Sequence, residues 1–170
     1  RNRYNKYCCH RYSSDGMIFI KIHSHEELEH YWGSPLQRAS EKGYPDIYDT
    51  GVYWVLIKDQ IPIAYTTSII CGDFAFVGNT YVRHEYRLGG LHTKLLEYRN
   101  EQLGDITKIT VVNPIEESKM EHLVKVIRRL GYKKIEKLSD ISDLMSDTMF
   151  YGIDLDEYEL WRLDHETDKS

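Results

Sequence analysis

The chain has 170 residues, of which 41% are hydrophobic and 29% are charged, and it carries a formal net charge of -5. A chain of this length and composition is expected to fold as one domain, residues 1–170, around its own hydrophobic core. Its longest apolar runs, VYWVLI and MIFIKI, fall far short of the ~20 residues that a membrane-spanning helix needs, so no membrane partner is expected.

Charge and cysteine content narrow the class of protein further. A duplex DNA binder is usually basic, whereas this chain is acidic, so nucleic acid is not the expected partner. The three cysteines lack a paired CxxC spacing and are too few for a disulfide framework, which favours a reducing compartment. We therefore expect a cytoplasmic protein.

Two short segments contain side chains that bind metals. CCH at residues 8–10 and HSH at residues 23–25 could contribute ligands, but zinc needs four ligands in a tetrahedron and the sequence completes neither set. Ser24 and Glu27 instead have the spacing of a capping box, which opens a helix. We therefore expect no metal site.

The two ends of the chain fit the expected domain less clearly than its middle. Residues 1–15 are rich in basic and tyrosine side chains, and we expect an extra arm that frays or packs as a strand. The alternative is that this arm binds single-stranded nucleic acid by stacking and charge neutralisation. Residues 156–170 are mostly polar, and the sequence leaves them as a tail without a place in the fold.

The first half of the chain predicts mainly strands. Residues 17–22 have the β-branched and aromatic content of a strand, and a helix is expected from Ser24 toward Gly33 or Gly43. Two β-rich runs then flank Lys58–Gln60, a polar interruption short enough for a hairpin turn. FAFVGNTYV is a further strand, joined to the previous one through a Gly-Asp turn.

The second half predicts helices that alternate with strands. Leucines at helical spacing indicate a helix that starts near Leu91 and ends at Gly104, and ITKITVVN is a strand. A second amphipathic helix ends at Gly131, and two closing strands, YKKIEKL and TMFYGIDL, are expected after it. This order predicts an α/β (α+β) fold with a strand-helix-strand crossover in a mixed sheet flanked by helices.

The stretch VRHEYRLGGLHTKLL joins a strand to a helix through two glycines. Helix N-termini present unpaired N–H groups and the positive end of the helix dipole, which favours a bound anion such as a phosphate. Gly89 and Gly90 permit close approach of a ligand, and Arg87 adds a fixed positive charge beside the turn. The spacing matches neither the P-loop nor the GxGxxG pattern, so we expect another diphosphate-bearing cofactor.

This stretch resembles the acyl-CoA loop of the GNAT family of acyltransferases. Its pattern of Arg or Gln, two residues, Gly, one residue, and Gly or Ala is met by Arg87, Gly90 and His92. VRHEYR is similar to the family's V-x-P-E-Y-R, and Asn113 and Leu130–Tyr132 fill the places of a later strand end and of Leu-Gly-Phe. The resemblance spans Met17 to Leu155 and implies a mostly antiparallel sheet around a central strand-loop-helix site.

The resemblance implies acetyl-CoA as the cofactor and direct attack on its thioester by a primary amine of a small molecule or a protein. Pantetheine would lie where the strand at 79–83 splays from the strand at 109–112. Carried over by position, the implied cofactor-binding residues are Tyr81, Val82 and Arg83 for pantetheine, Arg87, Leu88, Gly89, Gly90, Leu91, His92 and Thr93 for pyrophosphate, and Asn113 at the later strand end. A homodimer is compatible with this layout.

The sequence departs from the family pattern at two positions that concern activity. His92 replaces the second small residue of the loop, and Ile127 stands where the family often has a tyrosine that acts as an acid. We expect the catalytic residues to be His84, Glu85 and Tyr132, whereas Asp73, Asn79, Tyr81, Tyr98 and Tyr151 are further candidates for proton transfer. The alternative function is a binding or scaffold protein that keeps this fold without catalysis.

Overall fold

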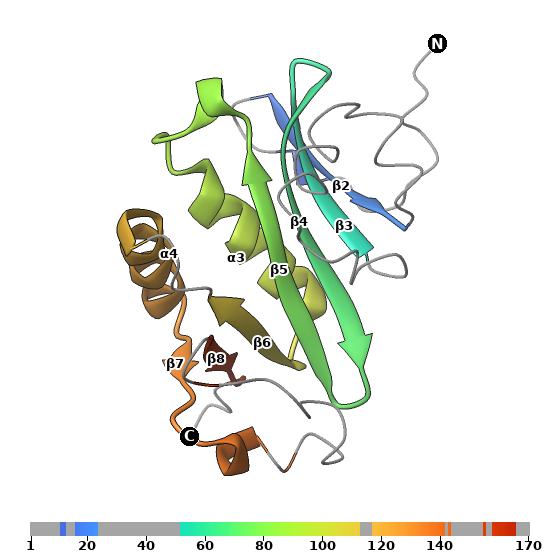
Figure 1. Ribbon diagram of the computed structural model, residues 1–170. Helices are drawn as coiled ribbons and strands as arrows, with labels where there is room; N and C mark the ends of the chain where they lie inside the picture. Colours follow the sequence, from blue (N-terminus) through green and yellow to red (C-terminus); the bar gives the residue numbers. More distant parts are fainter. Residues whose placement is uncertain are drawn as a thin grey trace, which may run out of the picture. The chain divides into compact units, whose positions relative to one another are not determined.

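The computed structural model describes residues 11–12, 16–23, 52–112, 117–141, 143, 155 and 158–165. These residues contain eight strands, two α-helices and two 3-10 helices, and the strands are hydrogen-bonded in the order β1-β2-β3-β4-β5-β6-β8-β7 (Figure 1). The chain divides into two compact units, residues 1–69 with 79–99 and residues 70–78 with 100–170. Each unit is described separately below.

The first unit is built on antiparallel strands. β2 (Met17–Ile22) pairs along its whole length with β3 (Val52–Lys58), and the short β1 (Arg11–Tyr12) pairs with β2. β3 pairs in turn with β4 (Ile61–Cys71). β-Branched and aromatic residues dominate these strands, and most of their side chains are buried. The predicted strand at 17–22 is confirmed, and part of the expected arm is a strand.

The turn between β3 and β4 lies where the sequence predicts it. Asp59 and Gln60 have φ values of 50° and 69°, the left-handed conformation that a tight two-residue hairpin requires at both central positions. A second turn, in which Gly72 has a φ of 61°, leads from β4 into β5 (Phe74–Val82). The predicted meander is therefore confirmed, and it carries the chain to the glycine-rich loop.

The predicted helix after that loop is α3 (Leu91–Leu103), and it ends at Gly104, whose φ is 63°. Its buried side chains are Leu95, Leu96, Tyr98 and Arg99. Tyr98 stacks on Phe19 of β2 with ring centroids 4.3 Å apart and meets Trp54 of β3 edge-on at 5.9 Å. These aromatic contacts fix α3 to the strands of the first unit.

The second unit contains the parallel crossover and the end of the chain. The first four residues of β5, Phe74–Val77, pair in parallel with β6 (Thr107–Val112) through α3, as predicted. β6 pairs antiparallel with β8 (Glu159–Leu163), which also pairs with the two-residue β7 (Lys133–Lys134). Part of the segment that the sequence leaves as a tail is therefore a paired strand.

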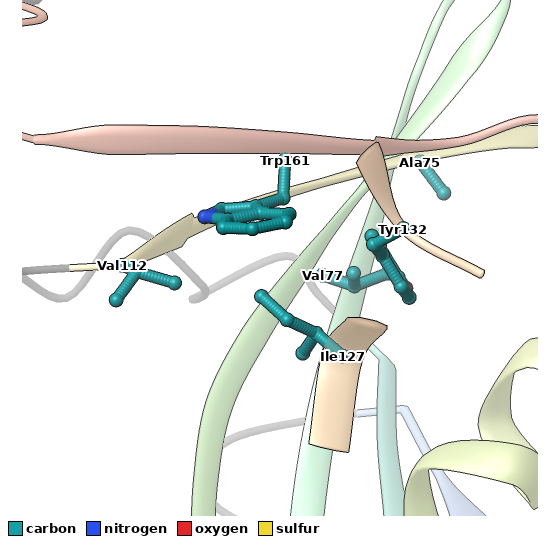
Figure 2. Close-up of a cluster of buried hydrophobic side chains, with 6 residues drawn as sticks. All are labelled: Ala75, Val77, Val112, Ile127, Tyr132 and Trp161. Atoms are coloured by element: carbon teal, nitrogen blue, oxygen red, sulfur yellow. The ribbon is translucent and has the colours of Figure 1, made fainter. Parts of the chain in front are cut away.

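β8 is covered by apolar side chains on both of its faces. Leu160 belongs to a cluster with Phe74, Ile109, Ile135 and Ile141. Its neighbour Trp161 belongs to a second cluster, and Figure 2 shows the indole above Val112, Ile127 and Tyr132. Because successive side chains of a strand point to opposite faces, a strand buried on both faces lacks the alternation by which sequences reveal strands.

Hydrogen bonds and ion pairs of Arg162 connect β8 to Asp140 and Asp143. The Arg162 guanidinium donates to Asp143 at 2.9 and 3.1 Å, to Asp164 through Nε at 2.8 and 2.9 Å, and to the Asp140 carbonyl at 2.8 Å. These bonds raise the pKa of Arg162 and lower the pKa of the Asp143 carboxyl. The network joins β8 to the 3-10 helix η2 (Leu138–Ile141).

α4 (Glu117–Arg129) is the predicted second amphipathic helix, and the chain leaves it at Gly131, whose φ is 98°. Ile127 on this helix is 2% exposed and belongs to the Trp161 cluster. Of the expected closing strands, YKKIEKL contributes only β7 and TMFYGIDL lies outside the described residues apart from Leu155, as does the helix expected from Ser24. No helix among the described residues is long and apolar enough to span a membrane.

Replacing Ile127 with alanine tests whether this side chain belongs to the core. We expect Ile127→Ala to lower the free energy of unfolding by about 2–5 kcal/mol, because it removes buried methyl groups and leaves a cavity. Lys125→Ala, at an exposed position of the same helix, is the control and should change it by less than about 0.5 kcal/mol. Denaturant unfolding of both variants measures the difference, and equal small effects would show that Ile127 is not a core residue.

Candidate functional site

The candidate site lies in the first unit, where β5 ends and α3 begins. After Val82 the chain passes through Arg83 into the 3-10 helix η1 (His84–Tyr86), turns over Arg87–Gly90, and enters α3 at Leu91 (Figure 1). Residues 87–90 are all exposed, whereas the first three residues of α3 are half-buried. The loop therefore presents its backbone at the surface beside the helix N-terminus.

Arg83 is directed toward β4. Its amide N–H donates to the Ile63 carbonyl at 2.8 Å, and its Nε–H donates to the Pro62 carbonyl at 2.7 Å. Because successive backbone N–H groups of a strand point to opposite edges, the Val82 N–H points away from β4. Of the three residues expected to contact pantetheine, Arg83 thus has its backbone N–H bonded to β4. The backbone N–H of Val82 points to the edge of β5 opposite β4.

The Arg87 side chain folds back onto the end of β5. Its Nε–H donates to the Val82 carbonyl at 2.9 Å, and its guanidinium carbon lies 5.6 Å from the centroid of the Tyr81 ring. Its amide donates to the His84 carbonyl at 3.3 Å, and its Nη groups donate no further hydrogen bond among the described residues. The Arg87 guanidinium is thus an oriented cation beside the loop, and its Nη groups can donate hydrogen bonds to a ligand.

The loop needs left-handed backbone at two positions. Gly90 has a φ of 75°, and a Cβ added there would meet no heavy atom within 4 Å. Leu88 has a φ of 67°, which a side chain disfavours by about 1–2 kcal/mol, and this residue is fully exposed. Gly90 therefore meets a conformational requirement and leaves open space, while Leu88 is strained without any compensating burial.

The N-terminus of α3 is suited to an anion. The Lys94 N–H donates to the Gly90 carbonyl at 3.2 Å, which makes Gly90 the residue where the helical hydrogen bonding begins. The preceding amides of Leu91, His92 and Thr93 are the first of the helix, and this turn contains no acidic side chain. Partial positive charge from the helix dipole is therefore not neutralised by a carboxylate of the first turn.

A row of tyrosines reaches the site from β3. Tyr81 stacks on Tyr65 of β4 with centroids 5.8 Å apart, and Tyr65 meets Tyr53 of β3 edge-on at 6.1 Å. Burial, with a smaller contribution from Tyr81, raises the pKa of Tyr65 to about 12. Tyr65 therefore stays protonated at neutral pH and is not a general base. Sequence reasoning missed Tyr65, although its position inside a β-rich run indicates a buried side chain.

The structure places the expected catalytic residues in different settings. His84 and Glu85 are exposed members of η1 in the first unit. Tyr132 belongs to the second unit, where it is 3% exposed and its hydroxyl donates to Asn100 Oδ1 at 3.3 Å. Of the other candidates, Asp73 is an exposed turn residue and Tyr98 is buried against Phe19, whereas Asn113 and Tyr151 lie outside the described residues.

Metal ligands are not gathered in the part of the chain that the structure describes. No group of three or more His, Cys, Asp or Glu side chains there could hold a metal ion. CCH at residues 8–10 and all of HSH except His23 lie outside the described residues.

Solved structures share this fold. A Bacteroides thetaiotaomicron protein assigned as a GNAT-family acetyltransferase superposes with a TM-score of 0.58 at 18% identity, covering 88% of each chain. The ribosomal-protein-S18-alanine N-acetyltransferase of Escherichia coli gives 0.55 at 13% identity, over 91% of this chain and 98% of that one. An acyl-CoA N-acyltransferase of Pseudomonas aeruginosa gives 0.57 at 13% identity, over 86% and 98%.

These similarities are similarities of fold, because the sequence identities are low. No family model matches the chain, and no curated protein is significantly similar to it in sequence. The expected GNAT-like fold, a mixed and mostly antiparallel sheet flanked by helices, is confirmed. Function has to be argued from the residues of the site.

The two left-handed positions of the loop give opposite predictions. Leu88→Gly should raise the free energy of unfolding by about 0.5–1 kcal/mol, because relief of the left-handed clash exceeds the entropy gained by the unfolded glycine. Gly90→Ala should lower it by about 1 kcal/mol through backbone strain alone, since a Cβ there meets open space. Denaturant unfolding measures both, and a destabilised Leu88→Gly would contradict the assigned loop conformation.

Proposed function

We propose that this protein is an N-acyltransferase that binds acetyl-CoA at the loop after β5 and transfers the acetyl group to a primary amine by direct attack. The observation that carries the proposal is the combination at one loop of an oriented, exposed Arg87, a left-handed Gly90 and the N-terminus of α3. The GNAT fold supports it, since this loop lies at the place where the family resemblance implies acyl-CoA binding. When bound, the cofactor would supply a thioester that an amine can attack.

The loop fits the diphosphate of CoA by charge and by space. The amides of Leu91, His92 and Thr93 would donate to its oxygens, because they are the first N–H groups of a 13-residue helix. Arg87 would add charge-assisted bonds through its Nη groups. Open space beside Gly90 lets the anion approach the backbone closely. His92 lies within this turn, where its ring would act as a further donor.

The edge of β5 opposite β4 would hold the pantetheine arm. The Val82 N–H points to this edge, whereas the Arg83 N–H is bonded to β4, so Val82 and not Arg83 provides the backbone donor. The Val82 carbonyl accepts from Arg87, which ties the cation to the same strand end. Tyr81 lies between them in sequence and stacks with Tyr65. In this proposal β5 orients the arm and Arg87 orients the diphosphate.

The reaction also needs a group that takes the proton of the amine. An alkyl ammonium has a pKa of about 10.4, so a base or a water chain has to take its proton before attack. His84 and Glu85 are exposed beside the loop, and we propose them as the groups that do so. Tyr132 is a weaker candidate for an acid than the sequence indicates, because it is buried and its hydroxyl donates to Asn100.

Removing the Arg87 side chain tests the cofactor site. Arg87→Ala should raise the Kd for acetyl-CoA about tenfold or more, because a charge-assisted hydrogen bond contributes about 1.5–3 kcal/mol and 1.4 kcal/mol corresponds to a factor of ten. Lys133→Ala, which removes the same charge from an exposed position on β7, is the control and should bind like the wild type. Equal affinities for all three proteins would remove Arg87 from the site.

The alternative function is a GNAT-fold binding or scaffold protein without catalysis. The observation that favours it is Ile127. This residue is buried in the core, and it stands where the family often has a tyrosine that acts as the general acid. Release of CoA thiol from acetyl-CoA in the presence of a panel of amines separates the two functions. Amine-dependent release supports the enzyme, whereas cofactor binding without release by any amine would favour the scaffold.

A further inference from the structure

A guanidinium is buried between α3 and the strands of the first unit. Arg99 is 2% exposed, and its Nη1 donates to the Thr66 hydroxyl at 2.8 Å. The Thr66 hydroxyl is in turn 2.8 Å from the hydroxyl of Thr80. Burying a charge costs several kcal/mol unless hydrogen bonds compensate for lost water, so this arrangement constrains its partners strongly. One hydrogen-bonded chain therefore joins α3, β4 and β5.

The guanidinium charge at one end strengthens the hydrogen bonds of this chain. The Thr66 oxygen accepts from the guanidinium, and an oxygen that accepts such a bond becomes a stronger donor through its own hydrogen. The Thr66 and Thr80 hydroxyls share one hydrogen bond, in which either oxygen can be the donor. Thr80 is β-branched, so fixing its hydroxyl restricts its side-chain rotamer and with it the orientation of the backbone at this residue.

Thr80 occupies a particular place on the proposed cofactor edge. It precedes Val82 by two residues on β5, so its backbone N–H points to the same edge as that of Val82, opposite β4. Two residues of a strand span about 7 Å, so this N–H lies about 7 Å further from the diphosphate loop. The thioester is at the end of the pantetheine arm remote from the diphosphate, and the edge at Thr80 is where its carbonyl would lie.

We infer that Arg99 is a positioning residue for acyl transfer, which acts through Thr66 and Thr80 to hold the Thr80 N–H toward the acetyl carbonyl. This inference rests on the proposed function, because it needs an acyl-CoA on the β5 edge. The step it serves is attack of the amine nitrogen on the carbonyl carbon, in which the carbonyl oxygen gains negative charge and CoA leaves as a thiolate. A fixed donor at that oxygen stabilises the developing charge.

A purely structural role would make a different prediction. Ser68 on β4 accepts a hydrogen bond from the Trp54 indole N–H at 3.0 Å, and it is 2% exposed. This bond is buried on the same strand as Thr66, and it is separate from the hydrogen bonds that join Arg99, Thr66 and Thr80. Ser68→Ala therefore removes a buried hydrogen bond to β4 without touching the Arg99 chain, and it serves as a matched control for stability.

The test is the infrared carbonyl stretch of acetyl-CoA labelled with 13C at the acetyl carbonyl, measured free and bound at saturating protein. A hydrogen bond to the carbonyl oxygen lowers this frequency, so we expect a lowered frequency on the wild type and on Ser68→Ala. Thr80→Val and Arg99→Met should raise the frequency above that of the wild-type complex, and Thr80→Ser, which keeps the hydroxyl, should retain the wild-type frequency. Thr80→Val keeps the shape of the side chain, which provides a result if Arg99→Met fails to fold.

The outcomes separate this inference from the proposed function. Binding by all variants with the same lowered frequency would overturn the role of Arg99 and leave the cofactor site intact. A loss of frequency shift that follows stability, and so appears equally in Ser68→Ala, would also overturn it. No binding of acetyl-CoA by the wild type would overturn the proposed function together with the inference. A lowered frequency that Thr80→Ser retains and Thr80→Val loses supports the inference.

Discussion

The docking of α3 onto the strands of the first unit is the constraint on which the candidate site depends. Two adjacent residues of this helix make the contacts: Tyr98 packs on Phe19 and Trp54, and Arg99 donates to Thr66. An α-helix of 13 residues is stiff, so fixing its middle also fixes its first turn. The loop after β5 has to reach that turn, and its left-handed residues follow from the short connection.

The strands beneath α3 combine apolar packing with buried hydroxyls. Thr66, Thr67 and Ser68 of β4 are each 2% exposed or less, at the centre of a unit whose other buried residues are mostly apolar. Such groups destabilise a core unless they are hydrogen-bonded, and a fully bonded polar network fixes one arrangement more strictly than apolar contacts do. A strand end that has to present a backbone edge to a ligand benefits from that strictness, because small displacements of a binding group are costly.

Local chemistry explains which features the sequence could predict. The turn at Asp59–Gln60, the end of α3 at Gly104 and the loop at Gly90 each follow from residues adjacent in the chain, and the structure places all three as expected. The sequence does not predict β8. Leu160 and Trp161 are adjacent and pack into different clusters, so the strand lacks alternation, and charged residues flank this short apolar pair. Its pairing depends on contacts distant in sequence, which no local pattern contains.

The same distinction applies to the site. The sequence predicts Arg87 and the helix N-terminus correctly as neighbours, because they share one loop. It does not predict that the Arg83 amide is bonded to Ile63, since strand register decides which N–H groups face outward. The burial of Arg99 is equally hidden, because an arginine on an amphipathic helix is ordinarily exposed. Only the three-dimensional pairing of β4 and β5 with α3 reveals its partners.

The most direct test of the account is a calorimetric titration of acetyl-CoA into the wild type, Gly90→Glu and Gly72→Glu. Both glycines have a positive φ and open space where a Cβ would lie, so the two variants introduce the same strain and the same charge at different turns. The account predicts binding by the wild type and by Gly72→Glu, and loss of binding by a folded Gly90→Glu, whose carboxylate repels the diphosphate. Absence of binding by the wild type, or undiminished binding by Gly90→Glu, would contradict it.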